Sequence, residues 1–433
     1  MIVCKFGGSS VASSSQIIKV KKILEDNPNR RIAVVSAPGK RDKDDEKITD
    51  LLYKCNALVR NGSSSKPVFK KVAERFLQIA YELGLDQKPI ELVLDDIRYK
   101  IDAGSGADYT ASRGEYLSAF IISQYLKWEF VDAEDSIIIK SDGTVNPLTY
   151  DRLKMVFEDR RKRYVIPGFY GCGDDRMIKT FTRGGSDITG SVVARAVGAD
   201  LYENWTDVSG IFSADPRLVK DSTVIDEITY KEVRELSDYG ASVFHEEAIA
   251  PIQNTDIPIN IRNTNKPEDK GTMIVPYSEK KKLAGVSVKG GLSRLSLRRL
   301  MLFKGQGTRH ALLTMLHIFG VRPVYSLYGI DSVVWFFESK SAGESVLDAM
   351  CQRLKDEFML DEIHVDSGYA IMGLVGTNLY ESDSYLRAAE RLKKENIKTY
   401  FMNYGASQVS ATFGLKEEDK EKALEVVYDE LFR

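Results

Sequence analysis

A regular alternation of short apolar runs and helix-period segments over residues 1–275 most constrains how this chain can fold. The runs with strand character are Ile2–Phe6, Arg31–Ser36, Ser136–Lys140, Arg163–Pro167 and Leu201–Trp205. The helix-period segments are Gln16–Glu25, Val68–Leu83, Gly114–Lys127 and Asp187–Val197. Such alternation predicts a mainly parallel sheet with helices on both faces. Sheets of this kind bind ligands beyond the carboxyl ends of their strands.

The composition narrows the function classes. A chain of 433 residues predicts two or three domains. With 43% hydrophobic and 29% charged residues and a formal net charge of −2, it has no basic field that would draw it to nucleic acid or an anionic membrane. No stretch approaches the roughly 20 apolar residues that span a bilayer, and Met1–Lys5 is typical of a strand rather than a signal peptide. The four scattered cysteines form no metal-type pair, so we expect a cytoplasmic protein.

After a polar boundary at 263–282 the pattern changes to two short βαββα units. Residues 321–329 align with 397–405 at a constant offset, and a helix-period segment precedes and follows each, which favours a duplication. In the first part of the chain, the charged segment 40–47 predicts a solvated, mobile loop, in preference to a specific charged contact.

Two Gly-Gly turns each stand where a helix begins. The first, Lys5-Phe6-Gly7-Gly8-Ser9-Ser10, lets the backbone approach a phosphate, offers helix-start N–H groups and adds the charge of Lys5; it lacks P-loop spacing. The second, Thr182-Arg183-Gly184-Gly185-Ser186-Asp187, places Arg183 where it could clamp a carboxylate, and Asp187 where it could act on a ligand or cap its helix. Two such loops in one α/β domain suggest two anions facing each other, as phosphoryl transfer to an acid requires.

Other polar residues leave alternatives open. Glu115, in Ser112-Arg113-Gly114-Glu115, could pair with a ligand ammonium group or cap its own helix. Thr206–Phe212 and the following Arg217 could form only a turn, or hold the base, ribose and phosphate of a nucleotide. No two of the four histidines have metal-ligand spacing. A carboxylate acceptor is ionised at neutral pH and needs no general base, so aligning two anions and neutralising charge would suffice.

These blocks together resemble the aspartokinase family of the amino-acid-kinase superfamily. Besides the turns, Ser36-Ala37, Thr206-Asp207-Val208-Ser209-Gly210, Tyr239-Gly240-Ala241 and Gly271-Thr272 match family blocks in order, and the C-terminal repeat stands where the family has two ACT modules. The resemblance implies a kinase that uses ATP with Mg²⁺ to phosphorylate the side-chain carboxylate of L-aspartate, the first step toward lysine, threonine and methionine. It implies no fused homoserine dehydrogenase after Arg433 and no metal ligands from protein side chains.

The resemblance also implies residue roles. Lys5 and Asp187 are the expected catalytic residues. The expected ATP-binding residues are Lys5, Gly7, Gly8, Ser9, Thr206, Asp207, Phe212, Arg217 and Ser242. The expected aspartate-binding residues are Ser36, Thr49, Glu115, Arg183, Gly184 and Ser186. An amino-acid effector, lysine or threonine, would bind near Gly307, Thr308, Val324, Gly329 and Ile330, and the ACT modules would form a homodimer or a dimer of dimers.

Some positions depart from the family pattern. Ser242 stands where many members have a nucleotide-contacting lysine, and Glu246 where they have proline. The segments 304–308 and 328–330 lack the usual serine and acidic residues of a lysine site. Alternatives are a superfamily kinase acting on glutamate, carbamate or a nucleotide, and a catalytically inactive amino-acid sensor.

The expected architecture is a three-layer αβα sandwich with a mainly parallel sheet over 1–278, a linker and strand over 279–292, and ferredoxin-like βαββαβ ACT modules over 293–367 and 368–433. The second module lacks a sixth strand, while residues 283–288 have strand character and no partner. Because an open sheet edge beside a spare strand is unfavourable, we expect 283–288 to pair with the second module.

Overall fold

The computed structural model describes residues 1–182, 184–241, 244, 246–279, 283–377, 379, 381–404 and 407–433. It consists of two compact units. The first unit comprises residues 1–212, 224–237 and 242–279, and the second comprises 213–223, 238–241 and 280–433. Within the described residues, no helix is both long and apolar enough to cross a bilayer.

The first unit is built on an eight-stranded, mainly parallel sheet with the order β3-β4-β2-β1-β7-β9-β10-β8. Its strands are β1 (Ile2–Phe6), β2 (Arg30–Val35), β3 (Glu129–Phe130), β4 (Tyr164–Pro167), β7 (Leu201–Thr206), β8 (Glu227–Thr229), β9 (Ile259–Asn263) and β10 (Thr272–Val275). Among the described strands of this sheet, only the β9–β10 pair is antiparallel. A two-stranded hairpin, β5 (Tyr170–Cys172) and β6 (Ile178–Thr180), lies apart from this sheet.

The predicted strand Ser136–Lys140 is wrong. Residues 133–136 form the short helix α6 (Ala133–Ser136), and Ile138 and Ile139 make only isolated bridges. These isoleucines are nevertheless buried. A short apolar run therefore indicated burial here, not membership of the sheet.

The main helices of the first unit supply the apolar faces that cover the sheet. They are α1 (Ser14–Glu25), α2 (Ile48–Arg60), α3 (Lys66–Glu82), α4 (Lys88–Asp102), α5 (Ala107–Leu126), α7 (Leu148–Val156), α8 (Gly185–Val197) and α9 (Tyr230–Asp238). Helix α1, for example, buries Ile17, Val20, Ile23 and Leu24 along one stripe. Helix α5 begins seven residues before the predicted Gly114, because its first two turns are polar and gave no apolar period.

The charged segment 40–47 is exposed over residues 40–44, but it does not lack specific contacts. Asp45 accepts hydrogen bonds from Arg41 and forms an ion pair with the buried Arg75. Burial acts to raise the pKa of Asp45, yet hydrogen bonds from Arg41 and the charge of Arg75 lower it to about 2. Glu46 pairs with two lysines of neighbouring helices. The alternative of a specific charged contact therefore applies at this end of the segment.

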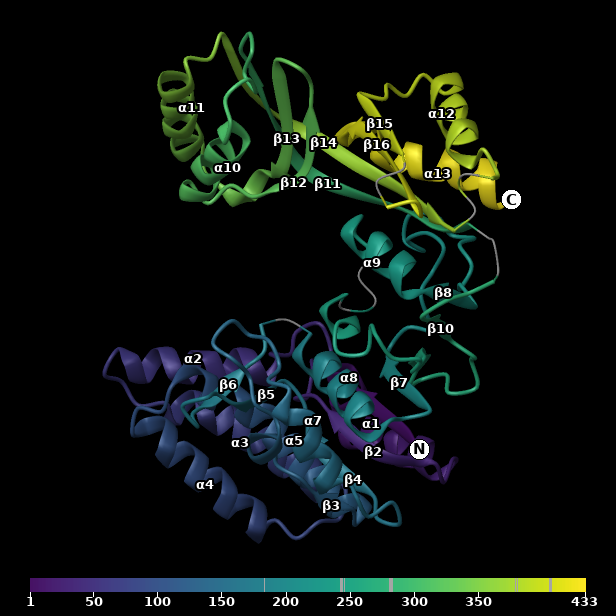
Figure 1. The fold of residues 1–433 in the computed structure, drawn as a ribbon. Helices are drawn as coiled ribbons and strands as arrows, with labels where there is room; N and C mark the ends of the chain where they lie inside the picture. The colour runs from purple at the N-terminus through teal and green to yellow at the C-terminus, as the bar shows by residue number, and fades with distance from the viewer. Residues whose placement is uncertain are drawn as a thin grey trace. The chain divides into compact units, whose positions relative to one another are not determined.

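The second unit is organised around two long antiparallel strands, β11 (Leu283–Arg298) and β14 (Glu362–Gly376). The six-stranded sheet has the order β12-β13-β11-β14-β16-β15. Its other strands are β12 (Pro323–Tyr328), β13 (Ser332–Glu338), β15 (Phe401–Tyr404) and β16 (Ser410–Lys416). Figure 1 shows α10 (Thr308–Ile318) and α11 (Glu344–Phe358) beside one half of this sheet, and α12 (Ser384–Lys394) and α13 (Lys420–Phe432) beside the other.

The two halves share their central strands. Residues 283–289 of β11 pair with 371–376 of β14, and 292–298 pair with 362–369, with irregular register between Lys289 and Leu292. The spare strand 283–288 thus lies where the open-edge argument placed it. The expected module limits at 292/293 and 367/368 fall inside continuous strands. Each half keeps its own hydrophobic core, one containing Trp335 and the other Phe413.

Two segments that we expected in the catalytic region belong to the second unit. Ser213 accepts a main-chain hydrogen bond from Val286 N–H (2.8 Å), and its hydroxyl is 3.1 Å from the Tyr428 hydroxyl. The Tyr239 hydroxyl is 2.7 Å from Thr412 Oγ1, and the Tyr239 main-chain carbonyl accepts a hydrogen bond from the Ser287 hydroxyl. These contacts incorporate 213–223 and 238–241 into the second unit.

Candidate active site

The candidate active site lies at the carboxyl ends of β1, β2 and β7, where loops and helix starts meet. Lys5 is buried near the end of β1, and its Nζ is 2.5 Å from Asp187 Oδ1 at the start of α8. Asn204 of β7 is in register with Lys5 and donates a hydrogen bond to the same Asp187 oxygen at 2.7 Å. The three side chains form one polar cluster in which the ammonium group and the carboxylate fix each other's position.

The Asp187 carboxylate does not act as an N-cap. The N-cap of α8 is Gly184, with a φ of 59°, and it makes no side-chain capping bond. Asp187 donates its own N–H to the Gly184 carbonyl and directs its carboxylate to Lys5 and Asn204. The capping alternative is therefore wrong, and the carboxylate contacts Lys5 and Asn204 instead.

The first Gly-Gly turn brings two backbone segments into close contact. Gly7 N–H donates to the Trp205 carbonyl (2.9 Å), and the Gly8 carbonyl accepts from Gly39 N–H (2.9 Å). A Cβ at Gly39 would lie 2.9 Å from the Gly8 carbonyl carbon, so no side chain fits between them. The turn leads into a 3₁₀ helix at Gly8–Val11. Helix starts present free N–H groups and suit phosphate oxygens.

Glu115 lies inside α5, more than one turn from the helix start, so the expectation that it could cap its own helix is wrong. It is only 5% exposed. Burial raises its pKa to about 8, against the effect of a hydrogen bond from the Ala37 main chain. Its Oε2 is buried and has no hydrogen-bond partner among the described residues. A buried carboxyl group with an unused oxygen is suited to receive a ligand cation.

The packing of α5 explains how Glu115 reaches the end of β2. A Cβ on Gly114 would lie 2.8 Å from Ala37 Cβ and 3.2 Å from Ile48 Cγ2, so only glycine lets α5 approach so closely. Ser36 follows β2 directly and donates its N–H to the Phe6 carbonyl (3.1 Å). Thr49 lies in the first turn of α2, next to Ile48. The structure thus brings the acceptor-side candidates Ser36, Thr49 and Glu115 to one region.

The remaining expected residues are placed in different parts of the chain. Ser186 is buried in the first turn of α8, and Thr206 ends β7 with its hydroxyl 3.3 Å from Asp207 Oδ1. Phe212 makes an isolated bridge with Val224. Arg217 belongs to segment 213–223 of the second unit, where it forms an ion pair with Asp215. Arg183 and Ser242 lie outside the described residues.

The expected effector residues lie on α10, on β12 and in the β12–β13 turn of the second unit's first half. Gly307 and Thr308 begin α10, and Val324 belongs to β12. Gly329 and Ile330 follow in the β12–β13 turn, where Ile330 is 89% exposed. Arg309 lies 4.9 Å from the Tyr328 ring, which joins the helix start to this turn.

Sequence patterns did not identify Asn204 or Gly39. An asparagine in the middle of the buried strand β7 was the one available signal, since a buried amide needs a polar partner. For metal binding, the described residues contain no group of three or more His, Cys, Asp or Glu side chains that could hold an ion.

Comparisons with known proteins agree with this geometry. Residues 1–263 match the model of the amino acid kinase family. The chain is 33% identical to aspartokinase 3 of Bacillus subtilis, over 100% of this chain and 99% of that protein. It superposes on the crystal structure of Clostridium acetobutylicum aspartate kinase with a TM-score of 0.90, at 38% identity and 99% coverage of both chains.

A more distant structure shares the fold. Escherichia coli aspartokinase III, solved with lysine and aspartate, superposes with a TM-score of 0.81 at 23% identity and 100% coverage of both chains. The family match and the full-length relatives identify a phosphotransferase of the amino-acid-kinase class. Within that class, the chain belongs to the aspartokinase family.

Proposed function

We propose that this chain is an aspartate kinase that transfers the γ-phosphoryl group of ATP to the side-chain carboxylate of L-aspartate. The product is 4-phospho-L-aspartate, the first intermediate toward lysine, threonine and methionine. The carrying observation is that the first unit holds both the Lys5–Asp187–Asn204 cluster and the buried Glu115, whose Oε2 has no hydrogen-bond partner among the described residues. The full-length similarity to aspartokinases supports the same conclusion.

Lys5 serves the phosphate side of the reaction. Its ammonium group neutralises charge on the transferred phosphoryl group, while Asp187, held by Asn204, fixes where that ammonium lies. The N–H groups of Gly8 and Ser9 add donors for phosphate oxygens, and Gly7, whose N–H is bonded to the Trp205 carbonyl, allows the backbone to approach the phosphate. Because aspartate's carboxylate is ionised at neutral pH, no proton has to be removed from the nucleophile.

The acceptor side recognises the two backbone charges of aspartate. Glu115 pairs with the ammonium group, and Arg183 clamps the α-carboxylate with two parallel hydrogen bonds. Ser36 and Thr49 lie near Glu115, and Gly184 and Ser186 begin the helix that also carries Asp187. This arrangement directs the side-chain carboxylate of aspartate toward Lys5.

Nucleotide and metal binding complete the site. Thr206, Asp207, Phe212 and Ser242 are the proposed contacts to ATP, whereas Arg217 belongs to the second unit. Mg²⁺ prefers oxygen ligands and keeps several waters, so it arrives on the nucleotide phosphates and supplies further charge neutralisation there. Asp187, which lies beside Lys5, is the carboxylate that would orient its water shell.

The second unit is proposed to regulate the enzyme. An amino acid, lysine or threonine, binds near the start of α10 and the β12–β13 turn, and the ACT modules associate the chains into homodimers or dimers of dimers in the cytoplasm. The proposed kinase domain lies within residues 1–278, without 213–223 and 238–241, which belong to the second unit. Size-exclusion chromatography with light scattering, with and without lysine or threonine, measures the assembly.

A hydroxamate assay tests the function. Hydroxylamine traps an acyl phosphate, so ATP-dependent hydroxamate formation should occur with aspartate and not with glutamate or carbamate. The Glu115→Gln variant is the matched control, because it keeps the shape of the site and loses the cation partner. Faster turnover of another acceptor would assign the chain to a different superfamily kinase, and no turnover with any acceptor would favour an inactive sensor.

A further inference from the structure

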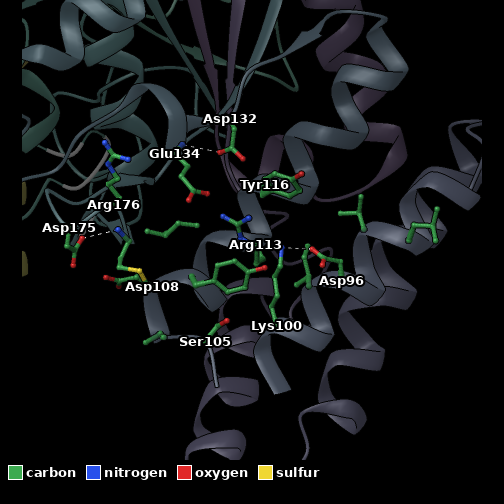
Figure 2. A pocket seen from close by; sticks show the side chains of 18 residues that line it. Asp96, Lys100, Ser105, Asp108, Arg113, Tyr116, Asp132, Glu134, Asp175 and Arg176 are labelled. Carbon is green, nitrogen blue, oxygen red and sulfur yellow. Dashed lines mark hydrogen bonds and ion pairs between the residues drawn. The ribbon is translucent and has the colours of Figure 1, made fainter. Parts of the chain in front are cut away.

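A second cavity in the first unit lies away from the candidate active site. It has a volume of about 920 Å³, within the range of small-molecule sites, and contains none of the residues proposed to bind ATP or aspartate. Its walls come from α4, the start of α5, the segment at 132–134 and the β5–β6 hairpin. Figure 2 shows charged side chains from these elements directed into it.

Arg113 of α5 supplies a buried positive charge to this cavity. The residue is only 5% exposed, and its guanidinium lies 4.6 Å and 4.7 Å from the centres of the Tyr109 and Tyr116 rings. Among the described residues, it donates hydrogen bonds only to the adjacent Ser112 hydroxyl, through Nε and Nη2. In the described parts of the chain, no carboxylate lies within ion-pair distance of it. Burying a cation without a carboxylate partner is unfavourable, unless a ligand supplies the negative charge.

Glu134 supplies the opposite charge. Its pKa is raised, first by burial and then by the neighbouring Asp132, while Arg113 opposes this. Asp132 accepts hydrogen bonds from the Tyr170 hydroxyl (2.7 Å) and from Glu134 N–H (3.0 Å). The Glu134 carboxyl group has no hydrogen bond or ion pair among the described residues. It therefore offers a place for a ligand cation on the same side of the cavity as Arg113 (Figure 2).

The charges of all the lining residues indicate which class of ligand the cavity suits. Five acidic and three basic side chains face the cavity, so a simple anion would meet a formal excess of two negative charges. A simple cation would leave the Arg113 charge without a partner. A ligand with both charges matches Arg113 and Glu134 together. The apolar residues Leu92, Val93 and Ile97 of α4 form the adjoining wall.

We propose that this cavity binds a free α-amino acid with an apolar side chain, its carboxylate on Arg113 and its ammonium group on Glu134. The apolar side chain rests on α4. Arg113 and Glu115 are two residues apart on α5, which places them about 200° apart around the helix axis. One helix thus lines two separate sites, and binding here does not require the kinase reaction.

Calorimetric titration of the full chain with L-leucine tests the proposal. Two half-probes accompany it: N-acetyl-L-leucine, which lacks the cation, and L-leucinamide, which lacks the carboxylate. L-leucine should bind, and each half-probe should bind roughly tenfold to a hundredfold more weakly, as expected for a lost charge-assisted contact. Equal binding of the three probes, or no binding of L-leucine up to millimolar concentration, would overturn the proposal.

Substitutions in the cavity lining test whether L-leucine binds in this cavity. Arg113→Gln and Glu134→Gln should each weaken L-leucine by a similar factor, while Arg176→Gln, at an exposed position of the lining, should change it less than about twofold. Glu134→Gln keeps the test decisive if Arg113→Gln fails to fold. The Glu115→Gln variant should retain L-leucine binding. Loss of binding in Glu115→Gln, or full binding in Glu134→Gln, would place the probe elsewhere and contradict the proposal.

Discussion

Replacing Glu115 by glutamine separates the cost of burying this carboxyl group from its use in binding. Burial raises its pKa from 4.5 to about 8. Between these values the folded chain holds a proton that the unfolded chain has released, so this group's contribution to stability is complete below pH 4.5 and is lost as the pH rises toward 8. The full span of about 3.5 units corresponds to on the order of 5 kcal/mol.

Glutamine resembles the protonated carboxyl group in shape and cannot ionise. At pH 7 the Glu115→Gln variant should therefore be more stable than the parent by roughly 3 kcal/mol. Its unfolding free energy should also lose a slope of about 1.4 kcal/mol per pH unit between 4.5 and 8. Urea unfolding of both proteins across this window measures the difference, following the first unit's transition if the two units unfold separately.

In the Glu115→Gln variant, the binding of aspartate should no longer be coupled to the release of a proton. Because only about a tenth of Glu115 is ionised at pH 7 in the free protein, pairing with the aspartate ammonium group should release nearly one proton. Calorimetry in buffers of different ionisation enthalpy counts that proton. The reasoning is refuted if the parent releases none, or if the parent and the glutamine variant share the same pH slope of stability.

Three further substitutions test the rest of the site. Lys5→Ala should lower kcat by about a hundredfold or more with little change in either KM; a folded variant with near-normal turnover would contradict the assigned role. Arg183→Ala should reduce kcat/KM for aspartate roughly tenfold to a hundredfold and spare ATP, because one charge-assisted clamp is lost; equal damage to both substrates would indicate a structural role. Asn204→Leu removes the hydrogen bond to Asp187 and should lower kcat roughly tenfold while leaving KM for aspartate within about twofold. An unchanged kcat in steady-state assays would show that Lys5 alone positions Asp187.

Short sequence motifs identified the candidate site residues that lie in a turn between a strand and a helix. The Gly-Gly turns and Asp187 stand out because a strand that ends in a tight turn before a helix needs a recognisable set of residues. Asn204 was not identified, since its partner is 17 residues away in the sequence and only the fold brings them together. The early start of α5 was missed for a related reason, because its first turns carry polar side chains.

The second unit shows the same limit at a larger scale. Counting the expected strands was enough to place 283–288 beside the second half of the sheet. The sequence alone shows one strand without a partner and one module without its sixth strand. That β11 and β14 continue through both halves was not visible, since the break at Lys289–Leu292 resembles a turn in the sequence. The capture of Ser213 and Tyr239 depends on single hydroxyl and main-chain contacts, which leave no periodic signature.

The interleaving of the two units limits how this chain can be cut. Removing residues 280–433 would strip β11, β16 and α13 from Ser213 and Tyr239, leaving two loops of the remaining piece without their hydrogen-bond partners. A fragment of residues 280–433 alone would lack 213–223 and 238–241, which belong to the same unit. The second unit therefore cannot be transferred as one contiguous segment of the chain. A cut near residue 280 would therefore divide the second unit, although the composition of the chain changes there.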